Sequence, residues 1–128
     1  MAAAEKNRQA LILFAHGARD ARWADPLVRI RQLIVNRVGG AAEVHLAFLE
    51  LMSPTLPELV PQLVAAQIES ICVVPIFLGQ GGHVRNDLPA LLHELTLAYP
   101  QVQFELKPAI GESDIVLDAI AEVCISSL

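Results

Sequence analysis

The chain has 128 residues, of which 54% are apolar, and a formal net charge of −5. This length suits a single core, so we expect one domain over residues 1–128. The nine basic residues are scattered along the acidic chain, which argues against broad binding of nucleic acid or of an anionic membrane surface. No apolar run approaches the roughly 18 residues of a membrane span. Cys72 and Cys124 are predicted to be core thiols in a reducing compartment. We therefore expect a cytoplasmic protein.

The first half of the chain predicts two pairs of a strand and a helix. Residues 10–15 are all apolar, which is typical of a strand buried on both faces. A helix is expected over 20–38, begun by Asp20 and closed by a glycine pair. Residues 43–50 alternate between apolar and polar side chains, as in an edge strand. The Thr-x-x-Glu spacing that follows predicts a capped helix over 55–67.

The second half repeats this order of elements. Residues 71–78 form another apolar run, in which Pro75 lacks a backbone donor and should mark a bulge or the fraying end of the strand. A stripe of apolar side chains over 84–95 predicts a helix. Residues 102–107 alternate as a second edge strand, and a last helix is expected to begin at residue 112 or 113 and to run through Cys124.

Strands that alternate with helices predict an α/β fold with a parallel sheet and helices on both faces. The two fully apolar strands belong in the middle of this sheet and the two alternating strands at its edges. The strand order 2-1-3-4 satisfies that assignment, so we expect a flavodoxin-like four-stranded parallel sheet.

Three chemically active side chains follow three of these strands. His16 follows the first, Glu50 ends the second, and His83 lies in the glycine-rich loop after the third. In such sheets, ligands bind beyond the carboxyl ends of the strands. Two imidazoles and a carboxylate suit a divalent metal such as cobalt, iron, nickel or zinc with one position left open, or a proton shuttle. The alternative is that each side chain only caps a loop or faces solvent.

Other sites are disfavoured by spacing. The stretch G-Q-G-G-H-V has valine where a dinucleotide-binding G-x-G-x-x-G has its third glycine, and no Gly-Lys-Ser/Thr follows. No G-x-S-x-G surrounds a serine, which argues against an α/β-hydrolase. His45 and His93 are expected to face solvent, and we leave both out of the site.

Four segments resemble, in order and spacing, the CbiX sirohydrochlorin chelatases, in their short form. They are AHGAR at 15–19, AFLE at 47–50, VVPIFLGQGGHVRNDLP at 73–89 and PAIG at 108–111. The resemblance implies a class II chelatase whose unit is half of a two-unit fold. It would insert cobalt or iron, with nickel a further possibility, into sirohydrochlorin on the way to cobalamin or sirohaem, without a nucleotide cofactor.

The resemblance also assigns residues and a partner. His16 and His83 map onto the family's metal ligands, which assist deprotonation, and Glu50 maps onto its glutamate. Longer relatives hold the tetrapyrrole in a cleft between two units, so a chain with one unit is expected to form a homodimer. Ala18 departs from the H-G-S-R pattern that is frequent in the family.

The substrate adds further expectations, because sirohydrochlorin carries many carboxylates. We expect local cations from Arg19, Arg22 and Arg85, whose alternative is ordinary surface arginine. Gly81 and Gly82, with the neighbouring Gly79, should let the backbone approach a flat macrocycle. The leading hypothesis is therefore a metal-inserting lyase. The alternatives are a noncatalytic metal or tetrapyrrole carrier and a flavodoxin-like module without a metal site.

Overall fold

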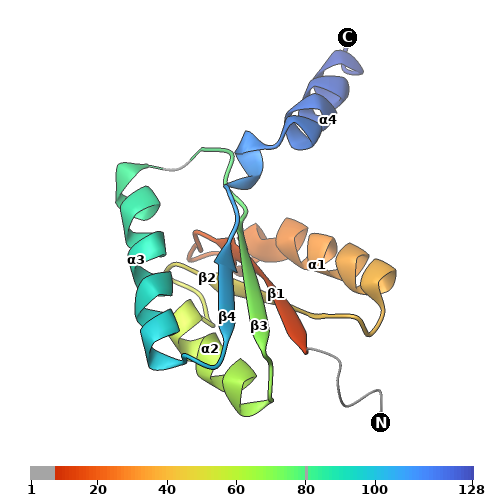
Figure 1. Cartoon of the computed structure of the whole chain (residues 1–128). Coiled ribbons are helices and arrows are strands. Elements are labelled where there is room, and N and C mark those ends of the chain that lie inside the picture. Colours follow the sequence, from red (N-terminus) through yellow and green to blue (C-terminus); the bar gives the residue numbers. More distant parts are fainter. Residues whose placement is uncertain (1–7, 80) are drawn as a thin grey trace.

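The computed structural model describes residues 8–79 and 81–128, without the side chain of His83. It contains one four-stranded sheet in the order β2-β1-β3-β4 with every strand parallel to its neighbours (Figure 1). This confirms the predicted fold class and strand order. The strands are β1 (Gln9–Ala15), β2 (Glu43–Phe48), β3 (Ser70–Pro75) and β4 (Gln103–Leu106). The helices are α1 (Asp25–Val38), α2 (Leu56–Ala65), α3 (Gly82–Ala98) and α4 (Asp114–Ile125), with 3₁₀ turns η2 (Ala21–Ala24) and η3 (Ile110–Glu112).

Two apolar clusters lie on opposite faces of the sheet. Ile12 and Phe14 of β1 belong to the larger cluster, in which α2 and α3 pack on one face. Ala15 of β1 joins Phe48 and Leu27 in a smaller cluster beneath α1. Because side chains alternate along a strand, the central strand β1 contributes to both clusters. The expectation of helices on both faces is confirmed by α1 on one side and by α2 and α3 on the other.

The element boundaries follow local chemistry. The Asp20 carboxylate accepts the Arg22 backbone N–H at 2.9 Å, so it caps the turn η2, which then leads into α1. The Thr55 capping box is present, with the Glu58 carboxylate accepting the Thr55 backbone N–H at 2.8 Å. Strand β3 ends at Pro75, as its missing donor predicts.

Helix α4 does not lie on the sheet. It projects from the body beyond the carboxyl ends of the strands (Figure 1), and its extensive contact within the described chain is with η3. Cys124 on α4 is consequently exposed, so the prediction that it is a core thiol is wrong, while Cys72 on β3 is half-buried. No helix among residues 8–79 and 81–128 has the length and apolar character to cross a membrane.

The two-sided core makes a prediction about stability. Ile12 is fully buried in the central strand, so Ile12→Ala should lower the free energy of unfolding by about 3 kcal/mol through lost burial and a cavity. Leu97→Ala, on the exposed side of α3, should change it by less than about 0.5 kcal/mol. Urea denaturation of both variants measures the difference. Equal effects would contradict the assignment of the core.

Candidate functional site

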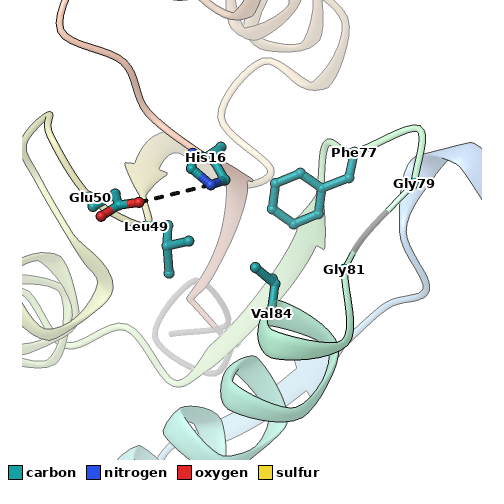
Figure 2. Close-up of a pocket in the computed structure, with 7 residues that line it drawn as sticks. All are labelled: His16, Leu49, Glu50, Phe77, Gly79, Gly81 and Val84. Carbon is teal, nitrogen blue, oxygen red and sulfur yellow. Dashed lines mark ion pairs between the residues drawn. The ribbon is translucent and has the colours of Figure 1, made fainter.

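The carboxyl edge of the sheet brings His16 and Glu50 together. The ladder between β1 and β2 continues past the strands, with the Leu49 N–H donating to Ala15 O at 2.9 Å and the Glu50 N–H to His16 O at 3.2 Å. This pairing sets the two side chains side by side, with 3.9 Å between His16 Nε2 and Glu50 Oε2 (Figure 2). Two of the three predicted site residues therefore meet, as the sheet topology implies.

Gly17 makes this approach possible. Its φ of 95° lies in the left-handed region, where residues with a side chain are strained. A Cβ at this position would overlap the Glu50 carbonyl oxygen. Sequence reasoning missed this requirement, although a signal for it is present in the glycine that directly follows His16.

An open pocket of about 410 Å³ lies beside the pair (Figure 2). Its apolar wall consists of Leu49, Phe77 and Val84. The Phe77 ring packs edge to face on Phe14, with 6.0 Å between the ring centroids, and is thereby fixed to the core. The remaining lining is His16, Glu50, Gly79 and Gly81.

The glycine loop leads directly from this wall into α3. Gly81 is the residue before the helix, and Gly82 is its first residue. His83 lies in the first turn, immediately before the pocket residue Val84, but its side chain is outside the described part of the structure. Among the described side chains, no three of His, Cys, Asp and Glu lie close enough to hold one metal ion. The participation of His83 stays a prediction.

The geometry of the pair suits a shared ion or a shared proton. Two ligands about 2.1 Å from one ion at a tetrahedral angle lie about 3.4 Å apart, so a small movement of either side chain would bring both onto one metal. About half of each side chain is exposed, at 52% for His16 and 57% for Glu50, which leaves both atoms accessible from the pocket. His16 Nδ1 lies 3.4 Å from Gly17 O.

The three predicted arginines differ in their surroundings. Arg22 donates two hydrogen bonds to the Asp20 carboxylate, at 2.9 and 3.2 Å. These bonds raise the pKa of Arg22 and lower the pKa of Asp20. The Arg22 guanidinium is therefore already paired with the Asp20 carboxylate. Arg19 and Arg85 are exposed, in the loop after His16 and in the first turn of α3.

The two histidines that we left out of the site do not line this pocket. His93 is exposed on α3, as predicted. His45 is half-buried and lies 3.0 Å from a Glu43 carboxylate oxygen, so the expectation that it faces solvent is only partly met. Glu43 also pairs with Arg8 at 3.0 Å, which makes this cluster an ion-pair group on the edge strand.

Several known proteins resemble this chain in sequence. The profile of the CbiX family matches residues 10–126. A sirohydrochlorin cobaltochelatase of Methanopyrus kandleri is 32% identical over 83 residues, which is 65% of this chain and 57% of that protein. A sirohydrochlorin ferrochelatase of Priestia megaterium is 25% identical over 113 residues, which is 88% of this chain and 42% of that protein. The matched part spans 57 to 62% of the length of three archaeal cobaltochelatases.

Solved structures have the same fold. A cobalamin biosynthesis CbiX protein from Marinobacter aquaeolei superposes with a TM-score of 0.81 at 30% identity, over 93% of this chain and 96% of that one. SirB, a sirohydrochlorin chelatase from Bacillus subtilis in complex with cobalt, superposes with a TM-score of 0.75 at 23% identity, over 90% of this chain and 49% of that one.

The role of Gly17 can be tested by adding one methyl group. Gly17→Ala should lower the free energy of unfolding by roughly 2 kcal/mol or more, because the methyl group meets the Glu50 carbonyl and the φ is unfavourable. Gly40→Ala is the matched control, since nothing lies within 4 Å of its Cβ position. Thermal unfolding of both variants measures the effect. Equal stability of the two would show that the close approach is not needed.

Proposed function

Because the chain belongs to the CbiX family, we propose that it is a sirohydrochlorin chelatase that inserts Co²⁺ or Fe²⁺ into the tetrapyrrole. The observation that carries this proposal is the His16–Glu50 pair beside an open apolar pocket at the carboxyl edge of the sheet. The names of the relatives, which include cobaltochelatases and a ferrochelatase, support the same reaction. The proposal requires no nucleotide cofactor. It places the chain in the synthesis of cobalamin or sirohaem, in the cytoplasm. Ni²⁺ is a further possible metal substrate.

The residues of the pair fit the steps of metal insertion. The incoming ion must exchange bound water for ring nitrogens, and two pyrrole protons must leave the macrocycle. A neutral imidazole at His16 can ligate the ion or accept a proton, and the Glu50 carboxylate stabilises the charge that results. We assign the same double role to His83, which the first turn of α3 carries next to the pocket.

The pocket suits one part of a flat macrocycle. Leu49, Phe77 and Val84 offer an apolar surface for the ring face, and Gly79 and Gly81 carry no side chain that would keep the ring from the backbone. The pocket is open to one side, so a second wall is needed to enclose the ring. We propose that residues 1–128 act as one unit of a homodimer, which would supply this wall. The length of SirB, of which this chain covers 49%, is consistent with two such units in one relative.

The first experiment follows metallation of sirohydrochlorin by its visible spectrum, with Co²⁺ and with Fe²⁺. The wild type should exceed the spontaneous rate, and His16→Ala and His83→Ala should each lose roughly 100-fold, because each removes a ligand and a proton acceptor. Glu50→Gln should lose roughly 10-fold. His93→Ala, exposed on α3 outside the pocket, is the control and should keep the wild-type rate.

The same experiment separates the enzyme from a carrier. Binding of metal or of the macrocycle without faster insertion would replace the chelatase by a binding protein. Binding of neither would favour a module whose histidines only cap loops.

The arginines provide a second prediction, on substrate affinity. Arg19→Ala and Arg85→Ala should each raise KM for sirohydrochlorin roughly three- to tenfold with little change in kcat, because each removes a cation that pairs with a substrate carboxylate. Arg22→Ala should have a smaller effect, since Asp20 already occupies its guanidinium. Arg37→Ala, exposed in the last turn of α1, is the control for net charge. An equal rise in KM for all four variants would indicate a general charge effect.

A further inference from the structure

The segment PAIG at 108–111 follows β4 and contributes no residue to the pocket lining within the described chain. The other three segments that resemble the CbiX family each supply part of that lining. The glycine of PAIG nevertheless contacts the pocket from outside. The Gly111 N–H donates to Phe77 O at 2.9 Å, and Phe77 lines the pocket. The segment is thus joined to the candidate site through the backbone.

Two features of the chain after β4 bring Gly111 to this place. The Lys107 N–H donates to Val73 O at 2.9 Å, so the ladder between β3 and β4 continues past the last residue of β4. Ala109 is buried, and the Glu112 N–H donates to Ala109 O at 2.9 Å within the turn η3. Gly111 therefore lies on a short turn whose start is held against the sheet.

Position 111 requires a glycine for space and not for its backbone conformation. Among the described glycines, Gly17 and Gly39 have a positive φ, whereas Gly111 does not. A Cβ at position 111 would overlap the carbonyl oxygen, the carbonyl carbon and the Cα of Leu78. These are backbone atoms, so the rotation of a side chain cannot relieve the overlap. The missing side chain of Gly111 is what lets η3 fit against Leu78.

The contact with Leu78 is made where side-chain packing along the loop ends. The Leu78 side chain is 67% exposed. Three glycines of the loop have nothing described within 4 Å of their Cβ positions, namely Gly79, Gly81 and Gly82. A segment with so little packing depends on its backbone contacts for order. Gly111 supplies such contacts to Phe77 and Leu78, at the point where the chain leaves the sheet.

The two sides of the pocket are built in the same way. Beyond β1 and β2, Gly17 lies against the Glu50 carbonyl. Beyond β3 and β4, Gly111 lies against the Leu78 carbonyl and binds the carbonyl of Phe77. On each side, a glycine lets one segment approach the backbone of the neighbouring segment closely.

We propose that Gly111 is a positioning residue of the site. It touches neither the metal nor the macrocycle, and it acts by fixing the backbone of Phe77 and Leu78, so that the Phe77 ring stays in place on its side of the pocket. The effect on metallation rests on the proposed function, whereas the order of this contact can be measured without substrate.

The first test is the steady-state kinetics of Gly111→Ala in the metallation of sirohydrochlorin. The KM for sirohydrochlorin should rise roughly three- to tenfold, because a displaced Phe77 ring loses contact with the macrocycle. The KM for Co²⁺ should stay within about twofold of the wild-type value, since the His16–Glu50 pair is held from β1 and β2. Gly40→Ala, with nothing within 4 Å of its Cβ position, is the matched control and should keep both constants.

Three results of this test would overturn the proposal. The first is an unchanged KM for sirohydrochlorin, and the second is an equal rise in both Michaelis constants. The third is a Gly111→Ala chain that does not fold, because the contact would then support the whole core and not one side of the pocket. Circular dichroism at the assay temperature measures the folded fraction.

A double-mutant cycle tests whether Gly111 acts through Phe77. Phe77→Leu removes the ring and keeps an apolar side chain. In this background, Gly111→Ala should raise the KM for sirohydrochlorin by less than roughly twofold, because no ring is left to displace. In an Arg19→Ala background, Gly111→Ala should keep its full effect, since Arg19 lies in the loop after His16. Effects of the same size in both backgrounds would contradict the route through Phe77.

Hydrogen exchange tests the contact without metal or macrocycle. After correction for intrinsic rates, the amide at position 111 should exchange at least roughly tenfold faster in Gly111→Ala than in the wild type, because the overlap with Leu78 separates it from Phe77 O. The Ile76 N–H, which donates to Phe14 O at 2.7 Å, is the internal control and should keep its rate.

The exchange rates separate this proposal from the proposed function. An unchanged rate at position 111, or an equal acceleration at Ile76, would overturn the positioning role even if the wild type metallates sirohydrochlorin. A wild type that does not metallate would refute the chelatase, while faster exchange confined to position 111 would still support the contact.

Discussion

The close approach of Gly17 to the Glu50 carbonyl is the constraint on which the site depends. It lets the ladder between β1 and β2 continue for two residues beyond the strands. That continuation sets the imidazole of His16 beside the carboxylate of Glu50, although 34 positions separate them in the sequence. The candidate site at this edge thus begins with a backbone contact, which positions the side chains of His16 and Glu50.

Much of the fold could be predicted from the sequence because each strand carries its own burial pattern. The continuous apolar runs of β1 and β3 require cover on both faces, whereas the alternating β2 and β4 belong at the edges. These two assignments leave few possible orders for the four strands. The turn η2 was not predicted, since the Asp20 side chain that begins it has the same character as the cap of an α-helix.

The sequence predicted which residues gather at the candidate site, but it did not predict how their atoms are arranged. Topology alone brings His16 and Glu50 to one edge, but nothing in the sequence reports the 3.9 Å between their atoms. The sequence does not show whether Arg22 pairs with a neighbouring carboxylate. The coordinates show that it pairs with Asp20. The exposure of Cys124 was missed because an apolar helix predicts burial, whereas α4 does not pack on the sheet.

The hydrogen bond from Gly111 to Phe77 joins two parts of the molecule that we have treated separately. Phe77 belongs to the wall of the pocket, and Gly111 belongs to the root of α4. Whatever orders the turn that precedes α4 therefore also orders the pocket wall. In the proposed homodimer, a second copy encloses the pocket, so occupation of the pocket and assembly would be linked equilibria. The affinity for the macrocycle would then rise with the concentration of the protein itself.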